Sequence, residues 1–207
     1  MVTLAGQRPD DDGAAPQRPL LYEPDDNDAA ARGACVDLAM GGDDDCEPYQ
    51  EVAVPGDPDE ILAATNRHVQ CAVFTDAVEA VFGTTYRPVT WAAHCFFVAP
   101  DHVLEINVNL NPIDAPADYG RGEVYSDRRE TEIAGRPAVT FRSNSNAFFD
   151  IYLSPHGDLK AQGNLHVGLR AMGGRGTDHG ARHVAVDRKH TEAAVKVMAA
   201  AVGKYFA

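Results

Sequence analysis

The apolar residues of "HVLEINVNL" (102–110) recur with a period of two, and this pattern constrains the fold more than any other feature of the chain. One face receives Leu104, Ile106, Val108 and Leu110, and the opposite face receives Glu105, Asn107 and Asn109. Such alternation predicts a half-buried strand of an antiparallel sheet. The segments 136–142, 147–153 and 159–170 continue the pattern, and "SPHG" (154–157) supplies the turn between the last two.

Three further segments have the signals of helices. Residues 58–70 follow Asp57 as N-cap, and residues 75–82 begin at Thr75 and end before Gly83. The segment 187–206 predicts a C-terminal helix with an apolar stripe, which consists of Ala194, Val197, Met198, Ala201, Val202 and Tyr205. This order predicts an α+β fold, an antiparallel sheet of four to five strands with N-terminal and C-terminal helices packed on it.

The net charge of −13 is concentrated at the N-terminus. Residues 1–60 hold sixteen Asp or Glu against three Arg, whereas residues 61–207 hold fifteen acids and fifteen bases. We therefore expect an acidic, Pro- and Asp-rich extension over residues 1–34 and one α+β domain over residues 35–207, which begins with an acidic cysteine loop. Such a charge balance argues against nucleic acid and anionic lipid surfaces as partners, because both attract Lys and Arg.

The extension contains one apolar island, Leu20, Leu21 and Tyr22. Charge and proline keep the rest of this segment from burying enough apolar surface to order itself. The island is either a docking point for a partner protein or a local contact without function.

The start of the chain bears on localisation. Val2–Gly6 has the small and apolar residues of the end of a signal peptide, although a plain start of the chain explains it as well. Gln7 stands where a lipid-anchored protein would need a cysteine. No run approaches eighteen apolar residues, so no transmembrane helix is predicted in this chain.

Four cysteines, Cys35, Cys46, Cys71 and Cys95, allow three disulfide pairings, between which the sequence cannot choose. The spacing lacks the paired C-x2-C elements of a structural zinc site and the C-x-x-C of a redox dithiol. We favour Cys71–Cys95 and Cys35–Cys46, with free buried thiols as the alternative. Disulfides would place the protein outside the cytoplasm.

Catalytic and cofactor motifs are weak. His179, His183 and His190 surround a Gly-rich loop and are the best metal candidates, but no H-E-x-x-H accompanies them. The chain has no G-x-S-x-G nucleophile motif. We therefore predict no cofactor and no catalytic residue.

Residues 69–206 resemble a family of actinobacterial secreted lipoproteins known as a domain of unknown function (number 3558). The likeness rests on "CAVFTDAVEAVFGT", then "HCFF", "HVLEINVNL" and "IAGRPAVTF", followed by further strands and an Ala- and Val-rich C-terminal helix. It implies a cell-envelope location and an α+β fold, and it brings no catalytic residues. The chain lacks the lipobox cysteine and a further cysteine that such proteins often carry after the P-A turn.

The sequence is compatible with three functions. The first is a non-enzymatic secreted or cell-envelope protein that binds a partner protein, a larger complex or an envelope component through its acidic extension. The second is a carrier of a small molecule or lipid in a pocket between sheet and helices. The third is a metal-dependent hydrolase that uses the histidines near the Gly-rich loop.

Overall fold

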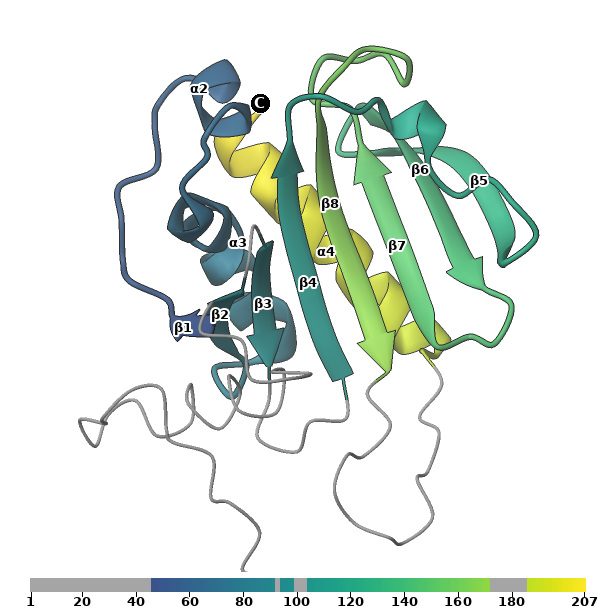
Figure 1. The fold of residues 1–207 in the computed structure, drawn as a ribbon, viewed down its shortest axis with the longest axis horizontal. Helices are drawn as coiled ribbons and strands as arrows, with labels where there is room; N and C mark the ends of the chain where they lie inside the picture. The colour runs from purple at the N-terminus through teal and green to yellow at the C-terminus, as the bar shows by residue number, and fades with distance from the viewer. Residues whose placement is uncertain (1–45, 92–93, 99–103, 172–185) are drawn as a thin grey trace, which may run out of the picture.

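The computed structural model of this 207-residue chain describes residues 46–91, 94–98, 104–171 and 186–207. Within these ranges, eight strands form one antiparallel sheet in the order β1-β2-β3-β4-β8-β7-β6-β5 (Figure 1). The strands are β1 (Cys46–Pro48), β2 (Arg87–Trp91), β3 (His94–Val98), β4 (Leu104–Asn111), β5 (Tyr125–Ile133), β6 (Arg136–Ser143), β7 (Phe148–Leu153) and β8 (Asn164–Ala171).

The connection between β4 and β5 brings distant parts of the chain together. From β4 near the middle of the sheet the chain passes through a short 3-10 helix, η1 (Pro116–Asp118), and enters β5 at the far edge. It then returns strand by strand until β8 pairs with β4 along its whole length. Residues that lie about sixty positions apart in the sequence thus become neighbours at the centre of the sheet.

The prediction of an antiparallel sheet with helices is confirmed, but the predicted count of four to five strands is wrong. The strand β2 was missed because Pro88 weakens its strand pattern. The strand β5 reads "YSDRRETEI" and has no alternation, because it lies at the edge of the sheet and carries a bulge between Ser126 and Arg129. Charges and bulges are typical of edge strands, which must avoid pairing with other chains.

The helices are α2 (Pro58–Leu62), α3 (Arg67–Phe82) and α4 (Arg188–Tyr205). Asp57 caps α2 as predicted, but this helix ends at Leu62, and α3 begins after Asn66, whose side chain accepts the N–H of His68. The predicted start of a helix at Thr75 is therefore wrong. A threonine hydroxyl can cap a helix or bond back to an earlier carbonyl, and Thr75 donates to the carbonyl of Cys71.

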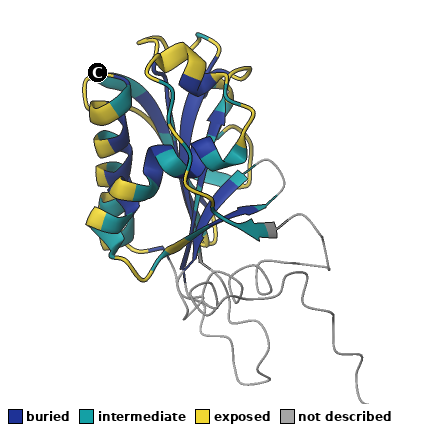
Figure 2. Ribbon diagram, turned by 90° about the vertical axis from the view of Figure 1, so that its left-hand side faces the viewer, coloured by how far each residue is buried: buried dark blue, intermediate teal, exposed yellow. Residues whose placement is uncertain are grey.

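The main hydrophobic core lies between one face of the sheet and the helices α3 and α4 (Figures 1 and 2). From α4, the predicted stripe residues Ala194, Val197, Met198, Ala201 and Val202 are buried, and Tyr205 packs against the core as a half-buried residue. From α3, Val73, Phe74, Ala77 and Val78 are buried. Apolar burial of this extent is the main force that holds the layers together.

None of the helices within the described ranges is long and apolar enough to cross a membrane.

Candidate functional site

The face of the sheet opposite α3 and α4, here called the open face, carries most of the buried ionisable side chains. The pairing register places Phe96, Asn107, Gly168 and Asp150 in one row across β3, β4, β8 and β7. Because side chains alternate along a strand, the residues two positions away lie on the same face. We use the name open-face cluster for His94, Glu105, Asn107, Asp150, His166 and Arg170.

Asp150 is the most strongly bound member of the open-face cluster. Its Oδ1 lies 2.7 Å from His166 Nε2, and both of its oxygens contact the guanidinium of Arg170 at 2.9 and 3.0 Å. Burial alone would raise the pKa of Asp150, but the hydrogen bond to His166 and the charge of Arg170 together hold this pKa below its usual value. The carboxylate of Asp150 is therefore ionised and fully used by the protein itself.

Gly168 makes the contact between Asp150 and His166 possible. A Cβ atom at this position would lie 2.7 Å from Asp150 Oδ1 and 2.9 Å from His166 Nε2. Separations this short are not found for real Cβ atoms. The acid and the imidazole thus meet directly over a backbone position that only glycine leaves free.

Glu105 lies opposite Arg170 in the pairing of β4 with β8 and is 6% exposed. Its burial raises the pKa to about 7, and the attraction of Arg170 opposes this shift only in part. The two nitrogens at the end of Arg170 turn to Asp150 instead. Among the described residues, the structure shows no hydrogen bond to the carboxyl of Glu105.

Two polar atoms of the cluster, Asn107 Oδ1 and His94 Nδ1, are buried without a hydrogen-bond partner in the part of the chain that the structure describes. Burial lowers the pKa of His94, and the nearby His166 lowers it further, so the ring of His94 is neutral at pH 7. Buried polar atoms of folded proteins are normally paired, because an unpaired one costs about 1–3 kcal/mol. Two such atoms on the same face as the buried carboxyl of Glu105 are the arrangement expected of a site that a ligand completes.

Aromatic rings border the open-face cluster on two sides. On the side of β7, the ring of Tyr152 stacks on His166 with centroids 4.4 Å apart, and Tyr119 from the η1 segment stacks on Tyr152 at 3.7 Å. On the side of β2 and β3, Phe96 lies between Trp91 and His94 at about 6 Å from each, with centroid distances of 6.0 and 6.1 Å. The polar groups thus lie on the sheet between two aromatic borders.

A separate hollow of about 240 Å³ lies near the start of α4. It is lined by Asp127, Arg129, Thr140, Arg142, Asn146 and Phe149. Arg142 already donates to the carbonyl of Val186 and to the hydroxyl of Thr191, and Arg129 is mostly exposed beside Asp127. The charged groups of this hollow have protein partners or are largely exposed, so it is a weaker candidate than the open-face cluster.

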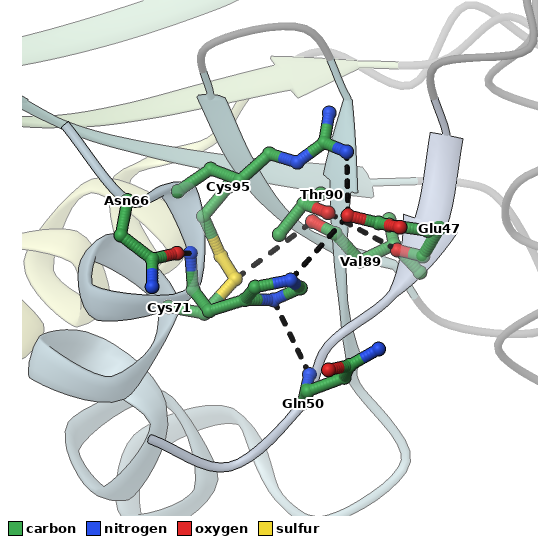
Figure 3. Close-up of polar contacts among 9 residues, drawn as sticks. Glu47, Gln50, Asn66, Cys71, Val89, Thr90 and Cys95 are labelled. Carbon is green, nitrogen blue, oxygen red and sulfur yellow. Dashed lines mark hydrogen bonds and ion pairs between the residues drawn. A yellow bond between two sulfur atoms is a disulfide. The ribbon is translucent and has the colours of Figure 1, made fainter. Parts of the chain in front are cut away.

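Cys71 and Cys95 form a disulfide, as predicted, which ties α3 to β3 (Figure 3). Both residues are fully buried in the core on the helix side of the sheet. The pair is therefore a structural link, and it lies away from the open face.

The start of α3 is held by β1 close to this disulfide (Figure 3). Glu47 forms an ion pair with Arg67 and lies 3.4 Å from Nε2 of His68, whose Nδ1 accepts the backbone N–H of Gln50. The backbone of Glu47 also accepts the hydroxyl of Thr90 from β2. These contacts fix the short edge strand against the helix, and we interpret them as structural.

The other predicted site residues are described only in part. Leu20, Leu21, Tyr22, Cys35, His179 and His183 lie outside the described residues, and of Cys46 only the backbone in β1 is described. His190 lies in the first turn of α4, with Nδ1 3.0 Å from Asp187 Oδ1. Over the part of the chain that the structure describes, no three His, Cys, Asp or Glu side chains form a group that would hold a metal ion.

No family model, no curated protein and no solved structure matches this chain. The resemblance of residues 69–206 to the secreted lipoprotein family therefore stays a prediction.

Sequence reasoning missed the open-face cluster, although it placed Glu105 and Asn107 on the polar face of their strand. The signal that points to the cluster is the polar alternation in "NLHVGLR" (164–170) and "FFDIYL" (148–153), where His166, Arg170 and Asp150 occupy the second face. These three residues become a site only once β8 is known to lie between β4 and β7.

Proposed function

We propose that this chain is a non-enzymatic secreted or cell-envelope binding protein that holds its ligand on the open face of the sheet. The observation that carries the proposal is the pair of buried atoms, Asn107 Oδ1 and His94 Nδ1, that have no hydrogen-bond partner among the described residues, together with the buried carboxyl of Glu105 on the same face. A bound ligand that pairs with them would recover the free energy that the unpaired groups cost.

The state of Asp150 favours a role in binding for this residue. A general acid or base needs a group that is free to exchange a proton with the substrate. The oxygens of Asp150 are held by His166 and Arg170, and its lowered pKa keeps it charged. Such a group fixes the shape and charge of a site, which is the role expected in a binding protein.

The disulfide supports the extracytoplasmic location. Disulfides persist in oxidising compartments and are rare in the cytosol. The link between Cys71 and Cys95 therefore agrees with secretion or attachment to the cell envelope, as the family resemblance implies.

The alternative of a carrier with a pocket between sheet and helices is less well supported. The side chains between the layers, such as Phe74, Phe97 and Met198, are almost completely buried against one another. A ligand there would have to displace core residues, whereas the open face offers polar groups without partners. The acidic extension with Leu20–Tyr22 lies outside the described residues, so its predicted role in docking a protein partner stays a prediction.

The proposal is tested by screening small polar fragments against the isotope-labelled, disulfide-bonded full chain by NMR. We expect the amide shifts of binding fragments to concentrate on β3, β4 and β8. Asn107→Leu should remove these shifts without destabilising the fold, because an apolar side chain of similar size relieves the unpaired atom. The exposed Asn144→Leu, in the turn between β6 and β7, is the control that should leave binding unchanged. Shifts that map elsewhere, or that survive in Asn107→Leu, would contradict the proposal.

A further inference from the structure

The chemistry of the open-face cluster specifies a class of ligand, if the proposed function is correct. We propose that the site recognises a positively charged amine, which sits against the Trp91–Phe96–His94 border and donates to Asn107 and Glu105. Three features of the cluster favour such a ligand: its free groups accept hydrogen bonds, one of its acids lacks a close partner, and aromatic rings border it.

The free groups are acceptors. Asn107 presents its buried side-chain oxygen, and the carboxyl of Glu105 is an acceptor in the ionised form that prevails above its pKa of about 7. The neutral ring of His94 offers one acceptor nitrogen, and its Nδ1 is buried and unpaired. An alkylammonium group carries three N–H donors and no acceptor, so it matches this set. A carboxylate or phosphate would place acceptor against acceptor.

The charges of the cluster also favour a cationic ligand. The two ionised groups that contact each other, Asp150 and Arg170, neutralise one another through a bidentate pair. Glu105 is then the acid whose ionised form lacks a close partner, since Arg170 faces it across the strands but turns its nitrogens to Asp150. A buried carboxylate is costly unless it is paired, and a cationic ligand supplies the pair.

The aromatic border supplies the third element of amine recognition. Trp91 and His94 are opposite one another in the pairing of β2 with β3, and Phe96 packs against both. Phe96 is itself opposite Asn107 in the pairing of β3 with β4. A cation within about 6 Å of an aromatic face is attracted by the ring, most strongly by Trp. A hydroxylated ligand could satisfy the acceptors but would leave the charge of Glu105 unpaired.

The test uses n-butylammonium chloride, with n-butanol and sodium butyrate as neutral and anionic analogues. Each compound is titrated into the full-length, disulfide-bonded chain at pH 7.5 and low salt, and binding is followed by NMR amide shifts. We expect n-butylammonium to bind at least about tenfold more tightly than either analogue, with shifts on β3 and β4, because only the cation pairs with Glu105.

Two variants and a control make the result specific. Glu105→Gln keeps the shape but removes the charge, and we expect it to weaken n-butylammonium binding about tenfold or more. Trp91→Leu should weaken binding several-fold, which keeps the proposal testable if Glu105→Gln folds poorly. Glu132→Gln, an exposed change on β5, should leave binding unchanged.

The possible failures are distinguishable. Equal binding of n-butanol and n-butylammonium, or full binding in Glu105→Gln, would overturn the amine proposal. If polar fragments other than amines bind the open face and n-butylammonium does not, the amine proposal is wrong and the proposed function stands. If no fragment of any class binds the open face, both are wrong.

Discussion

Asp150 and Gly168 show how single residues shape the open face. Asp150 is 2% exposed, yet it carries a charge, because His166 and Arg170 bind it from the neighbouring strand. A buried ion of this kind is stable only when its partners are well placed. Gly168 lies directly below that contact, and its lack of a side chain gives the acid and the imidazole the room to meet.

Gly168→Ala is therefore expected to destabilise the protein by about 1–3 kcal/mol, because its Cβ would separate Asp150 from His166 and leave a buried charge poorly paired. Gly203→Ala in α4 is the matched control. No atom lies within 4 Å of a Cβ there, so this change should stabilise the helix by roughly 0.5–1 kcal/mol. Urea unfolding measures both variants, and a neutral Gly168→Ala would show that the contact is dispensable.

The sequence predicted part of this site at the level of single residues. The alternation in 102–110 correctly assigned Ile106 and Val108 to the core face and Glu105 and Asn107 to the opposite face. It did not show that Glu105 is buried, since that depends on neighbours from other strands. Local period gives the face of a residue, and only the sheet order gives its neighbours.

At the scale of elements, the long helix α3 and the disulfide connect the first half of the chain to the sheet. The sequence predicted two helices, 58–70 and 75–82, where the structure has α2 and the uninterrupted α3. The error came from Thr75, which is a good cap by type but bonds to Cys71 within the helix. Cys71 therefore lies within α3, with its sulfur bonded to Cys95 in β3.

The double variant Cys71→Ala/Cys95→Ala tests what this link contributes. A bridge between residues 24 positions apart is expected to contribute about 3.5 kcal/mol through the lost entropy of the unfolded chain. We therefore expect the variant to unfold at lower urea concentration but to bind open-face ligands with unchanged affinity. A loss of less than about 1 kcal/mol would contradict the structural role of the bridge.

Strand order is the part of the fold that the sequence could not supply. The four predicted segments in 102–170 correspond to β4, β6, β7 and β8, so their existence was predictable from alternation alone. The strand β5 was hidden by its charges, and it is β5 that takes the chain to the far edge of the sheet. Without β5, nothing indicates that β8 returns to pair with β4, which is the pairing that assembles the site.

On the scale of the whole molecule, the two faces of the sheet have different tasks. The helix side buries the main apolar core and carries the disulfide, so it accounts for stability. The open face carries the buried carboxyl of Glu105 and the unpaired atoms of Asn107 and His94, which reduce stability in the free protein. Such a cost is understandable where a ligand is to be bound, since sites of function commonly trade stability for activity.

The destabilising effect of burying the carboxyl of Glu105 should appear in how the free energy of unfolding depends on pH. Glu105 faces Arg170 across the strands, and burial raises its pKa from 4.5 to about 7 in the folded chain. Between these values the folded chain holds a proton that the unfolded chain has lost, so the free energy of unfolding should fall as the pH rises. The shift corresponds to about 3 kcal/mol.

Glu105→Gln should remove this slope between pH 4.5 and 7. The effect is separate from that of Asp150, whose lowered pKa contributes stability that is lost only below its usual titration range. Urea unfolding of the wild type and Glu105→Gln at a series of pH values measures the difference. If the free energy of unfolding changed with pH in the same way in both proteins, the buried carboxyl of Glu105 would not be what destabilises the folded chain.

The most direct measurement is the NMR titration of the side-chain carboxyl carbon of Glu105 in the disulfide-bonded full chain, alone and with saturating n-butylammonium. We predict a pKa of about 7 in the free protein and a lower pKa in the presence of the amine, because the cation stabilises the carboxylate. A free pKa near 4.5, or a pKa that the amine leaves unchanged, would contradict the assignment of the open face as the ligand site.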